Sequence, residues 1–462
     1  MKEIIQKKLS ESKAARWTVL ILVSFLMLCG YFITDVMSPL KSMLEEQLLW
    51  TSSDYGLFTS GYGWFNVFFF MLIFGGMILD KKGARYSGVM SAVIMIIGAS
   101  IKYWAISTHS LDGETINFFG SPVAKQVIAA AFGYGIFGIG VEIAGITASK
   151  IIVKWFKGKE LALAMGLEMA CARIGTGLAI GITPMIATAF SVDGVPSLSK
   201  PILMGILLLI IGLISFLVFC VMDVKRDKQD VEGGVEEDEP FRMKDILDII
   251  KIKGFWYIAI LCVLFYSAVF PFLKYATDLM VNKFGVEQSL AGLIPSILPF
   301  GTILLTPLFG NMYDRKGKGA SIMIFGAIML ICIHLLFSLP FITNWVFAVI
   351  LTILLGVAFS LVPSAMWPSV PKIIPISKLG TAYALIFWIQ NWGLMGVPLL
   401  IGNVLDKYCK IVGPDGATIG YNYTIPMLIF TSFGVLALIF AILLKMEDKK
   451  KGYGLELPNI NK

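Results

Sequence analysis

Long apolar runs separated by short polar segments make up most of the chain. A helix that crosses a bilayer needs about 20 predominantly apolar residues, and the runs have about that length. They predict twelve membrane-spanning helices, at residues 17–40, 56–79, 86–107, 123–153, 161–190, 201–222, 255–282, 289–312, 320–339, 345–371, 379–405 and 424–445. The pattern therefore indicates an all-α membrane protein.

One polar stretch separates the first six runs from the last six. It contains the sequence DVEGGVEEDEPFRMKD, whose many charges and few apolar residues are typical of a solvated linker. We expect an N-terminal six-helix bundle at 1–222, a cytoplasmic linker at 223–254, a C-terminal six-helix bundle at 255–446 and a cytoplasmic tail at 447–462.

Composition supports a protein that is surrounded by lipid. Hydrophobic residues make up 57% of the 462 residues and charged residues only 15%, whereas soluble domains carry about 25% charged residues. The mean hydropathy is +0.81. These values exclude a soluble or disordered protein, and they predict a multi-pass integral membrane protein.

The basic residues predict the orientation, because loops rich in Lys and Arg face the cytoplasm. With the N-terminus inside, 29 of the 38 Lys and Arg lie in inside segments and seven in outside loops, Lys41 and Lys102 among them. The last two, Arg173 and Lys274, fall within apolar runs. Both termini are therefore predicted to be cytoplasmic. Because topology accounts for the net charge of +7, no nucleic-acid partner is expected.

The scarce reactive side chains do not indicate an enzyme. The six cysteines and two histidines are scattered, and no nucleotide-binding glycine loop is present, so we expect no metal site, no cofactor and no catalytic residue.

The N-terminal sixteen residues show no signal-peptide cleavage site, and the N-terminal tail shows no acidic dileucine sorting signal. We expect a bacterial inner (plasma) membrane protein that functions as a monomer.

A short motif occurs once in each half. GMILDKKGAR follows the second run and GNMYDRKGK follows the eighth. Each has an Asp (Asp80 or Asp314), a Gly three residues later that permits a sharp turn, and flanking cations. One copy would fit an ordinary basic turn, but two copies at matching places resemble the loop signature of the major facilitator superfamily. The resemblance implies two pseudo-symmetric six-helix bundles that rock about a midplane site, with both Asp residues as conformational latches.

Glu142 and Arg173 are predicted to reach the same depth in the membrane. At 1.5 Å of rise per residue, they lie about 18 Å and about 20 Å from the cytoplasmic ends of their helices. One interpretation is a buried pair that only neutralises itself. The other is that both face a cavity, where Arg173 binds a carboxylate and Glu142 an ammonium group.

A narrower resemblance bears on the substrate. Residues 137–175, with WFKGKEL at 155–161 and ARIG at 172–175, resemble the lysosomal dipeptide carriers of this superfamily and their bacterial relatives. Shorter similarities occur at YFITD, AVFPF and LGTAYALIFWIQNWGL. The resemblance implies a dipeptide as the small zwitterionic substrate, with Glu142 and Arg173 recognising the peptide termini.

Glu142 and Arg173, acting as two charged clamps on the peptide termini, would select one separation of those termini. Each added residue lengthens a peptide by about 3.5 Å, so a tripeptide would exceed it. Further candidates for substrate contact are aromatic or amide side chains within the runs: Tyr62, Trp64, Tyr383, Trp388, Gln390 and Asn391. The aromatic side chains have a competing interpretation, because rings in membrane spans usually serve packing or the interface.

Three further ionisable side chains are candidates for gating or coupling. Asp35 and Lys274 lie at matching depth in the first helix of each half, which predicts an outer gate; alternatively, Lys274 pairs with Asp278 one turn on. Glu168 is either a proton-coupling carboxylate or a structural residue bonded to a neighbouring helix.

The sequence therefore predicts a secondary carrier of short peptides, most of all dipeptides, that works by alternating access. Uniport and proton symport are both open. The alternative is an organic or inorganic anion carrier in which Arg173 binds the anion and Glu142 balances its charge.

Overall fold

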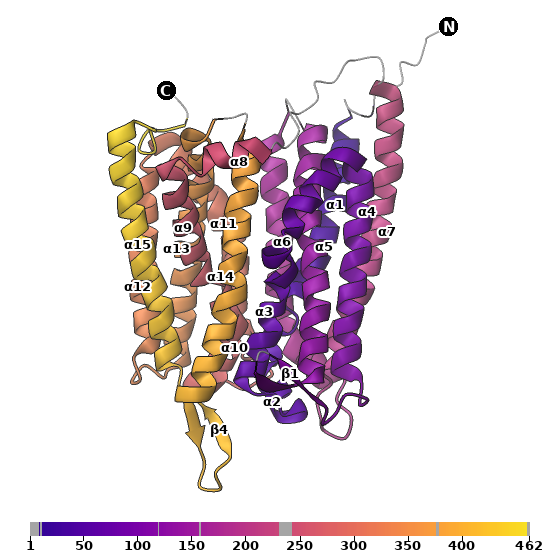
Figure 1. Ribbon diagram of the computed structural model, residues 1–462, viewed down its shortest axis with the longest axis vertical. Coiled ribbons are helices and arrows are strands. Elements are labelled where there is room, and N and C mark those ends of the chain that lie inside the picture. Colours follow the sequence, from indigo (N-terminus) through magenta and orange to yellow (C-terminus); the bar gives the residue numbers. More distant parts are fainter. Residues whose placement is uncertain are drawn as a thin grey trace.

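The fold consists of long, roughly parallel helices in two halves that lie side by side. A computed structural model describes residues 9, 12–118, 120–156, 159–230, 243–375 and 378–459. Figure 1 shows the first half in indigo to magenta and the second half in red to yellow. Residues 231–242 of the expected linker lie outside the described residues.

The first half contains helices, one 3-10 turn and one strand pair. Its elements are α1 (Lys13–Asp35), η1 (Ser38–Leu40), α2 (Lys41–Leu48), α3 (Ser52–Phe68), α4 (Met71–Ser107), β1 (Thr115–Phe118), β2 (Ser121–Ala124), α5 (Lys125–Phe156), α6 (Leu161–Ala189) and α7 (Ser199–Asp230). The second half comprises α8 (Met243–Ile249), α9 (Lys253–Ser267), α10 (Phe270–Phe284), α11 (Leu293–Lys316), α12 (Gly319–Ser338), α13 (Trp345–Ile373), α14 (Leu379–Tyr408), β3 (Lys410–Val412), β4 (Thr418–Tyr421) and α15 (Thr424–Lys451).

Eleven helices in the described part of the chain are long and apolar enough to cross a membrane. The expected second and third runs do not appear as two separate helices. The helix stops at Phe69 and Phe70, where Phe70 has a left-handed backbone conformation, so α3 is only 17 residues long. The next helix, α4, has 37 residues and turns sharply at Gly83.

The glycine of each signature motif makes the expected sharp turn. Gly83 has a φ of 81° and Gly317 a φ of 67°, values that only glycine adopts without strain. Gly317 is also closely packed, because a Cβ atom there would clash with the carbonyl oxygen of Glu456. The C-terminal segment thus packs against the second motif.

The first helices of the two halves are interrupted at matching places. α1 ends at Asp35 and is followed by η1, which contains Pro39. In the second half, α9 ends at Ser267, and α10 begins with Pro271 in its first turn. Proline lacks the amide hydrogen that would continue the preceding helix. Both interruptions border the interface between the halves.

Two short antiparallel strand pairs extend the fold beyond the expected helices. β1 pairs with β2 and β3 with β4. Figure 1 shows both pairs at one end of the bundle and α8 at the other. We call these the hairpin end and the α8 end. Strand pairs of this length were not visible in a pattern dominated by membrane-spanning runs.

The two halves are joined toward the hairpin end. The carboxylate of Asp406 accepts hydrogen bonds from the backbone amides of Ser52 and Ser53, at 3.2 and 2.5 Å. Beside them, α3 and α14 approach closely, since a Cβ atom on Gly402 would lie only 3.0 Å from the Cα atom of Gly56. The structure is therefore closed at this end.

At the α8 end, the short helix α8 is tied to the start of α14. Lys378 Nζ donates to Asp248 at 2.6 Å and lies 3.7 Å from Asp245. The hydrogen bond to Asp248 raises the pKa of Lys378 above its ordinary value. This tether fixes the linker side of the second half to the helix that carries Gln390 and Asn391.

Two cations assigned to outside loops are in fact buried, which corrects the loop count. Lys41 and Lys102 are each 1% exposed. Lys102 lies in the last two turns of α4, and its ammonium donates to the carbonyl of Ile33 at 3.0 Å. From the sequence both were expected in outside loops, because a Lys at the end of an apolar run usually reaches the interface.

Candidate functional site

A cavity of about 120 Å³ lies between the two halves. Six of the residues that the sequence singled out line its wall: Asp35, Tyr62, Glu142, Lys274, Gln390 and Asn391. They come from α1, α3 and α5 of the first half and from α10 and α14 of the second. Residues more than 350 positions apart are thereby brought to one site.

Glu142 is held in the cavity wall by a tyrosine. The hydroxyl of Tyr62 donates to Glu142 Oε1 at 2.8 Å, and the side chain of Asn391 approaches the same carboxylate. Both Tyr62 and Asn391 line the cavity with Glu142. A carboxyl group that is bound by neutral donors rather than by a cation stays available to pair with a cationic ligand.

Arg173 lies against two aromatic rings of the opposite half. Its guanidinium carbon is 5.2 Å from the ring centroid of Phe270 and 5.2 Å from that of Phe359. Arg173 does not itself line the cavity, but Phe270, which it contacts, does. Such cation–π contacts attract a guanidinium and leave its edge free to bind a carboxylate.

Glu142 and Arg173 do not neutralise each other directly. Among the described residues, no ion pair within 4.0 Å joins them, and their contacts are Tyr62 for Glu142 and Phe270 and Phe359 for Arg173. The structure therefore does not show the first interpretation, a buried ion pair between Glu142 and Arg173. Their role in binding stays a prediction.

Tyr31 of α1 is a further cavity residue that lies near several of the embedded charges. It lines the cavity, and the charges of Arg173, Glu142, Glu168 and Asp35 all act on its hydroxyl group. Sequence reasoning missed this residue. The only signal was its position one helical turn before Asp35, on the same face of the helix.

Asp35 and Lys274 meet at the hairpin side of the cavity. Lys274 Nζ lies 2.7 Å from Asp35 Oδ1 and also donates to the carbonyl of Thr34 and the hydroxyl of Tyr134, at 2.7 and 3.1 Å. The alternative partner, Asp278, instead binds Lys41 at 3.0 Å. The pair joins the two halves, while its function as a gate stays a prediction.

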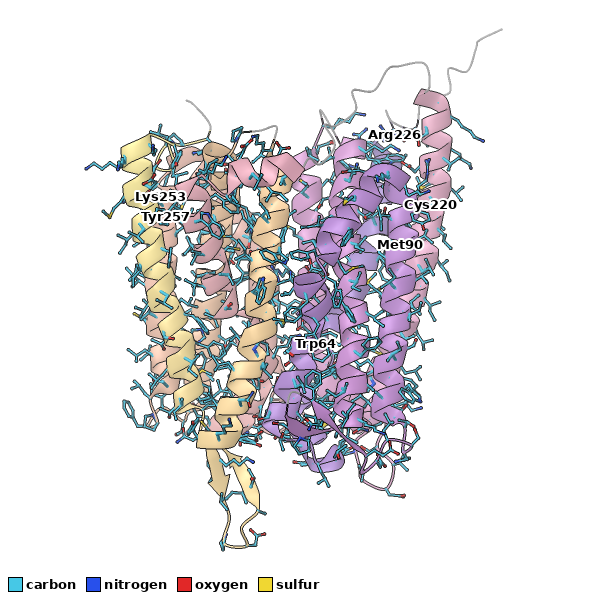
Figure 2. The ribbon with its side chains drawn as sticks, viewed as in Figure 1. Trp64, Met90, Cys220, Arg226, Lys253 and Tyr257 are labelled. Atoms are coloured by element: carbon cyan, nitrogen blue, oxygen red, sulfur yellow. The ribbon has the colours of Figure 1, made fainter. Side chains whose placement is uncertain are left out.

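Three of the candidate aromatic side chains do not line the cavity. Trp64 stacks on Phe118 of β1 and donates to Ser60, because two residues along a helix turn it about 200° away from Tyr62. Figure 2 shows Trp64 on the first half, nearer the hairpin end than the α8 end. The other two, Trp388 and Tyr383, bind backbone carbonyls instead: Trp388 that of Val67 and Tyr383 that of Trp367.

The two amides on α14 behave differently from those rings. Gln390 and Asn391 are 7% and 1% exposed and line the cavity. Gln390 Oε1 accepts a weak bond from the Cys262 thiol at 3.6 Å. Asn391 Nδ2 donates to the carbonyl of Phe387 at 3.0 Å.

The remaining candidates lie outside the cavity wall. Asp80 pairs with Lys150 of α5 at 2.7 Å, and Asp314 accepts from the side chain of Asn459 at 2.7 Å. Each signature Asp therefore has a partner within its own half. Glu168, in α6, is 9% exposed, and no hydrogen bond to its carboxylate is found in the described part of the chain.

The arrangement of two helical halves around a charged central cavity can be compared with known proteins. The sequence model of the Major Facilitator Superfamily matches residues 20–398 and, in a second match, residues 276–454. The chain belongs to the major facilitator superfamily. The two signature loops are therefore family features, and the protein is a membrane transporter rather than an enzyme by fold and relationship.

Curated relatives of this major facilitator protein include dipeptide transporters. The lysosomal dipeptide transporter MFSD1 of Homo sapiens is 27% identical over 403 residues, which cover 85% of this chain and 81% of that protein. MFSD1 of Danio rerio is 27% identical over 453 residues, covering 96% and 89%. A probable chloroplastic anion transporter of Arabidopsis thaliana is 22% identical over only 34% of the chain.

Solved transporters of the same fold superpose over almost the whole chain. The nucleoside transporter NupG has a TM-score of 0.68 at 17% identity and covers 93% of this chain and 98% of its own. A bacterial homologue of the human lysosomal transporter Spinster, inward-facing and occupied, has a TM-score of 0.70 at 13% identity, covering 95% and 98%. At these identities the likeness concerns the fold alone.

Proposed function

We propose that this major facilitator protein carries short peptides, dipeptides above all, across a membrane by alternating access. The observation that carries the proposal is that Glu142 and Arg173 lie at the central cavity without an ion pair between them, whereas the other two charges there, Asp35 and Lys274, bind each other. Glu142 lies in the cavity wall, and Arg173 stacks on a ring of that wall. A dipeptide presents one ammonium and one carboxylate at a short, fixed separation.

Each charge is suited to one end of such a substrate. Glu142 is held by Tyr62 at 2.8 Å, so it would bind the amino terminus without reorganising. Arg173 contacts the rings of Phe270 and Phe359, and among the described residues no ion pair within 4.0 Å involves its guanidinium, whose N–H donors suit bidentate binding of a carboxylate. The names of the relatives, which include dipeptide transporters over most of the chain, agree with this assignment.

Thermal stabilisation of the purified protein tests the substrate class, because a ligand that binds only the folded state raises its melting temperature. Unblocked dipeptides should stabilise the protein, and free amino acids, tripeptides, N-acetyl dipeptides and dipeptide amides should stabilise it much less. Stabilisation by N-acetyl dipeptides or by small anions, with no dependence on the amino group, would instead favour the anion carrier with Arg173 as its ligand.

Two neutral variants test the proposed roles of Arg173 and Glu142 separately. Arg173→Gln should remove discrimination between a dipeptide and its amide, and Glu142→Gln should remove discrimination between a dipeptide and its N-acetyl form. Glu114→Gln is the matched control, since Glu114 pairs with Lys125 on the exposed surface. If both cavity variants keep full discrimination, the two-clamp assignment is wrong.

The proposal includes the number of membrane spans and their orientation. We infer twelve spans, with the second divided at Phe69 and Phe70, both termini cytoplasmic, and the hairpin end facing outward from a bacterial inner membrane. Asp35 and Lys274 then form an outer gate, and protons are possible co-substrates through Glu168 or Asp35. Labelling of single cysteines placed in β4 and in α8, by an impermeant maleimide on intact cells, should modify only the β4 position.

A further inference from the structure

The carboxamide of Asn391 has a buried oxygen with no hydrogen-bond partner. The residue is 1% exposed, and Oδ1 is one of ten buried side-chain oxygens left unbonded in the described residues; of these ten residues, Asn391 alone lines the cavity. An unsatisfied buried acceptor costs roughly 1–3 kcal/mol. Such an atom in a cavity wall is what a site for a hydrogen-bond donor requires.

The orientation of the amide is fixed by its other end. Nδ2 donates to the carbonyl of Phe387 at 3.0 Å, and only the nitrogen can donate to a carbonyl. The opposite orientation would set two acceptors against each other. The oxygen therefore points away from the carbonyl of Phe387. The residue lines the cavity, where its nitrogen end approaches the carboxylate of Glu142.

We propose that Asn391 Oδ1 is a second acceptor for the substrate ammonium group, shared with the carboxylate of Glu142. The inference rests on the proposed peptide function and adds to it. An ammonium has three donors that must all be bonded when it is buried, and Glu142 with one neutral acceptor satisfies it better than Glu142 alone. The other donor that a dipeptide offers, its peptide N–H, is neutral and would need no carboxylate beside it.

In this arrangement the substrate would contact both halves of the transporter. Glu142 belongs to α5 of the first half and Asn391 to α14 of the second. One ammonium bound to both would connect the two halves through the substrate itself. Substrates without a primary or protonated amine would bind one half only and would not favour the conformation that brings the halves together.

The test measures binding to Asn391→Leu, which has similar volume and no acceptor. A dipeptide should bind about 10- to 100-fold more weakly to the variant than to the wild type, as expected for losing a hydrogen bond to a charged group. The des-amino analogue, which has the same acyl chain without the ammonium, should bind equally to both. Asn391→Ala provides a second variant without added bulk in case Asn391→Leu does not fold.

Asn66 offers a matched control. It is also 1% exposed, its Nδ2 donates to the carbonyl of Gly138 at 3.3 Å, and its Oδ1 is unbonded. It does not line the cavity. Asn66→Leu should therefore change stability without changing the preference for the ammonium.

The outcomes distinguish this inference from the proposed function. If wild-type protein binds no dipeptide, the peptide function itself fails. If it binds dipeptides and Asn391→Leu weakens the dipeptide and its des-amino analogue equally, Asn391 does not read the ammonium. A depsipeptide, whose ester replaces the amide N–H, completes the test: an effect of Asn391→Leu that vanishes with the depsipeptide would assign the oxygen to the peptide N–H and overturn the proposal.

Discussion

At the residue scale, the environment of Arg173 makes arginine and lysine unequal at that position. Two rings from the opposite half lie 5.2 Å from the guanidinium carbon. A guanidinium is planar and stacks on rings while its edge binds a carboxylate through two parallel bonds. Lysine keeps the charge but loses both properties.

Arg173→Lys should therefore bind dipeptides at least tenfold more weakly than the wild type, although the charge is retained. The loss of one bidentate contact and of a desolvated cation–π contact of about 2 kcal/mol gives this estimate. Isothermal titration with one dipeptide measures it. Equal affinity of Arg173→Lys and the wild type would show that charge alone is read at this position.

The embedded acidic and basic side chains and the contact of Asp35 with Lys274 could be predicted from the sequence, but the neutral partners of these charges could not. Glu142, Asp35 and Lys274 stand out because charges are rare inside apolar runs, and all three line the cavity. Tyr31 and Lys102 did not stand out, because a tyrosine in a span has many uses and a lysine near the end of one usually reaches water. Rotation about a helix, which separates Trp64 from Tyr62, depends on a helix orientation that no local pattern fixes.

At the element scale, closure of the hairpin end depends on α3 and α14 packing without side chains between them. A Cβ atom on Gly402 would clash with the carbonyl oxygen of Ser52 and lie 3.0 Å from the Cα atom of Gly56. Small residues allow helix backbones to approach this closely in membranes. Both atoms belong to the backbone, so the contact cannot be relieved by a rotamer change.

Gly402→Val should push α3 and α14 apart and favour a conformation open at the hairpin end. Impermeant maleimide applied from that side should then label a cysteine at Thr59, a cavity-lining position, several-fold faster than in the parent. The control is Gly396→Val on the same helix, where an added Cβ atom would meet no other atom within 4 Å. Unchanged labelling in Gly402→Val would mean that this approach does not limit opening.

Elements were predictable where one apolar run forms one helix, as for α12 and α15, which begin and end within a few residues of the expected runs except for the extended end of α15 at Lys451. They were not predictable where a run breaks inside the membrane. The left-handed Phe70 has no glycine or proline to announce it. Its break is supported from the other half, since Trp388 donates to the carbonyl of Val67 at 3.1 Å and stacks on Phe70.

At the scale of the whole molecule, two buried ion pairs join the halves at successive levels. Asp35 and Lys274 lie at the cavity, and Lys41 and Asp278 lie closer to the hairpin end. Lys41 binds Asp278 at 3.0 Å and Glu45 at 2.8 Å, and its ammonium lies 4.3 Å from the ring of Tyr421. Three segments of the chain, α2, α10 and β4, therefore meet around one ammonium.

Opening the hairpin end must break the pair of Lys41 with Asp278, because its members belong to different halves. Removing one partner from a buried pair costs about 3–5 kcal/mol, and every 1.4 kcal/mol changes an equilibrium constant about tenfold. If most of this cost falls on the closed conformation, the balance between conformations shifts toward one that is open at the hairpin end.

Lys41→Met and Asp278→Asn should each increase maleimide labelling of a cysteine at Thr59 from the hairpin side by at least tenfold. The double variant should label little faster than either single one, because both changes remove the same interaction and their effects are not additive. Lys125→Met, which breaks the exposed pair with Glu114 at the same end, should leave labelling unchanged, since exposed pairs contribute about 0–1 kcal/mol. Additive effects of Lys41→Met and Asp278→Asn would instead show that the two residues act on opening separately, and that the ion pair between the halves is not what holds the hairpin end closed.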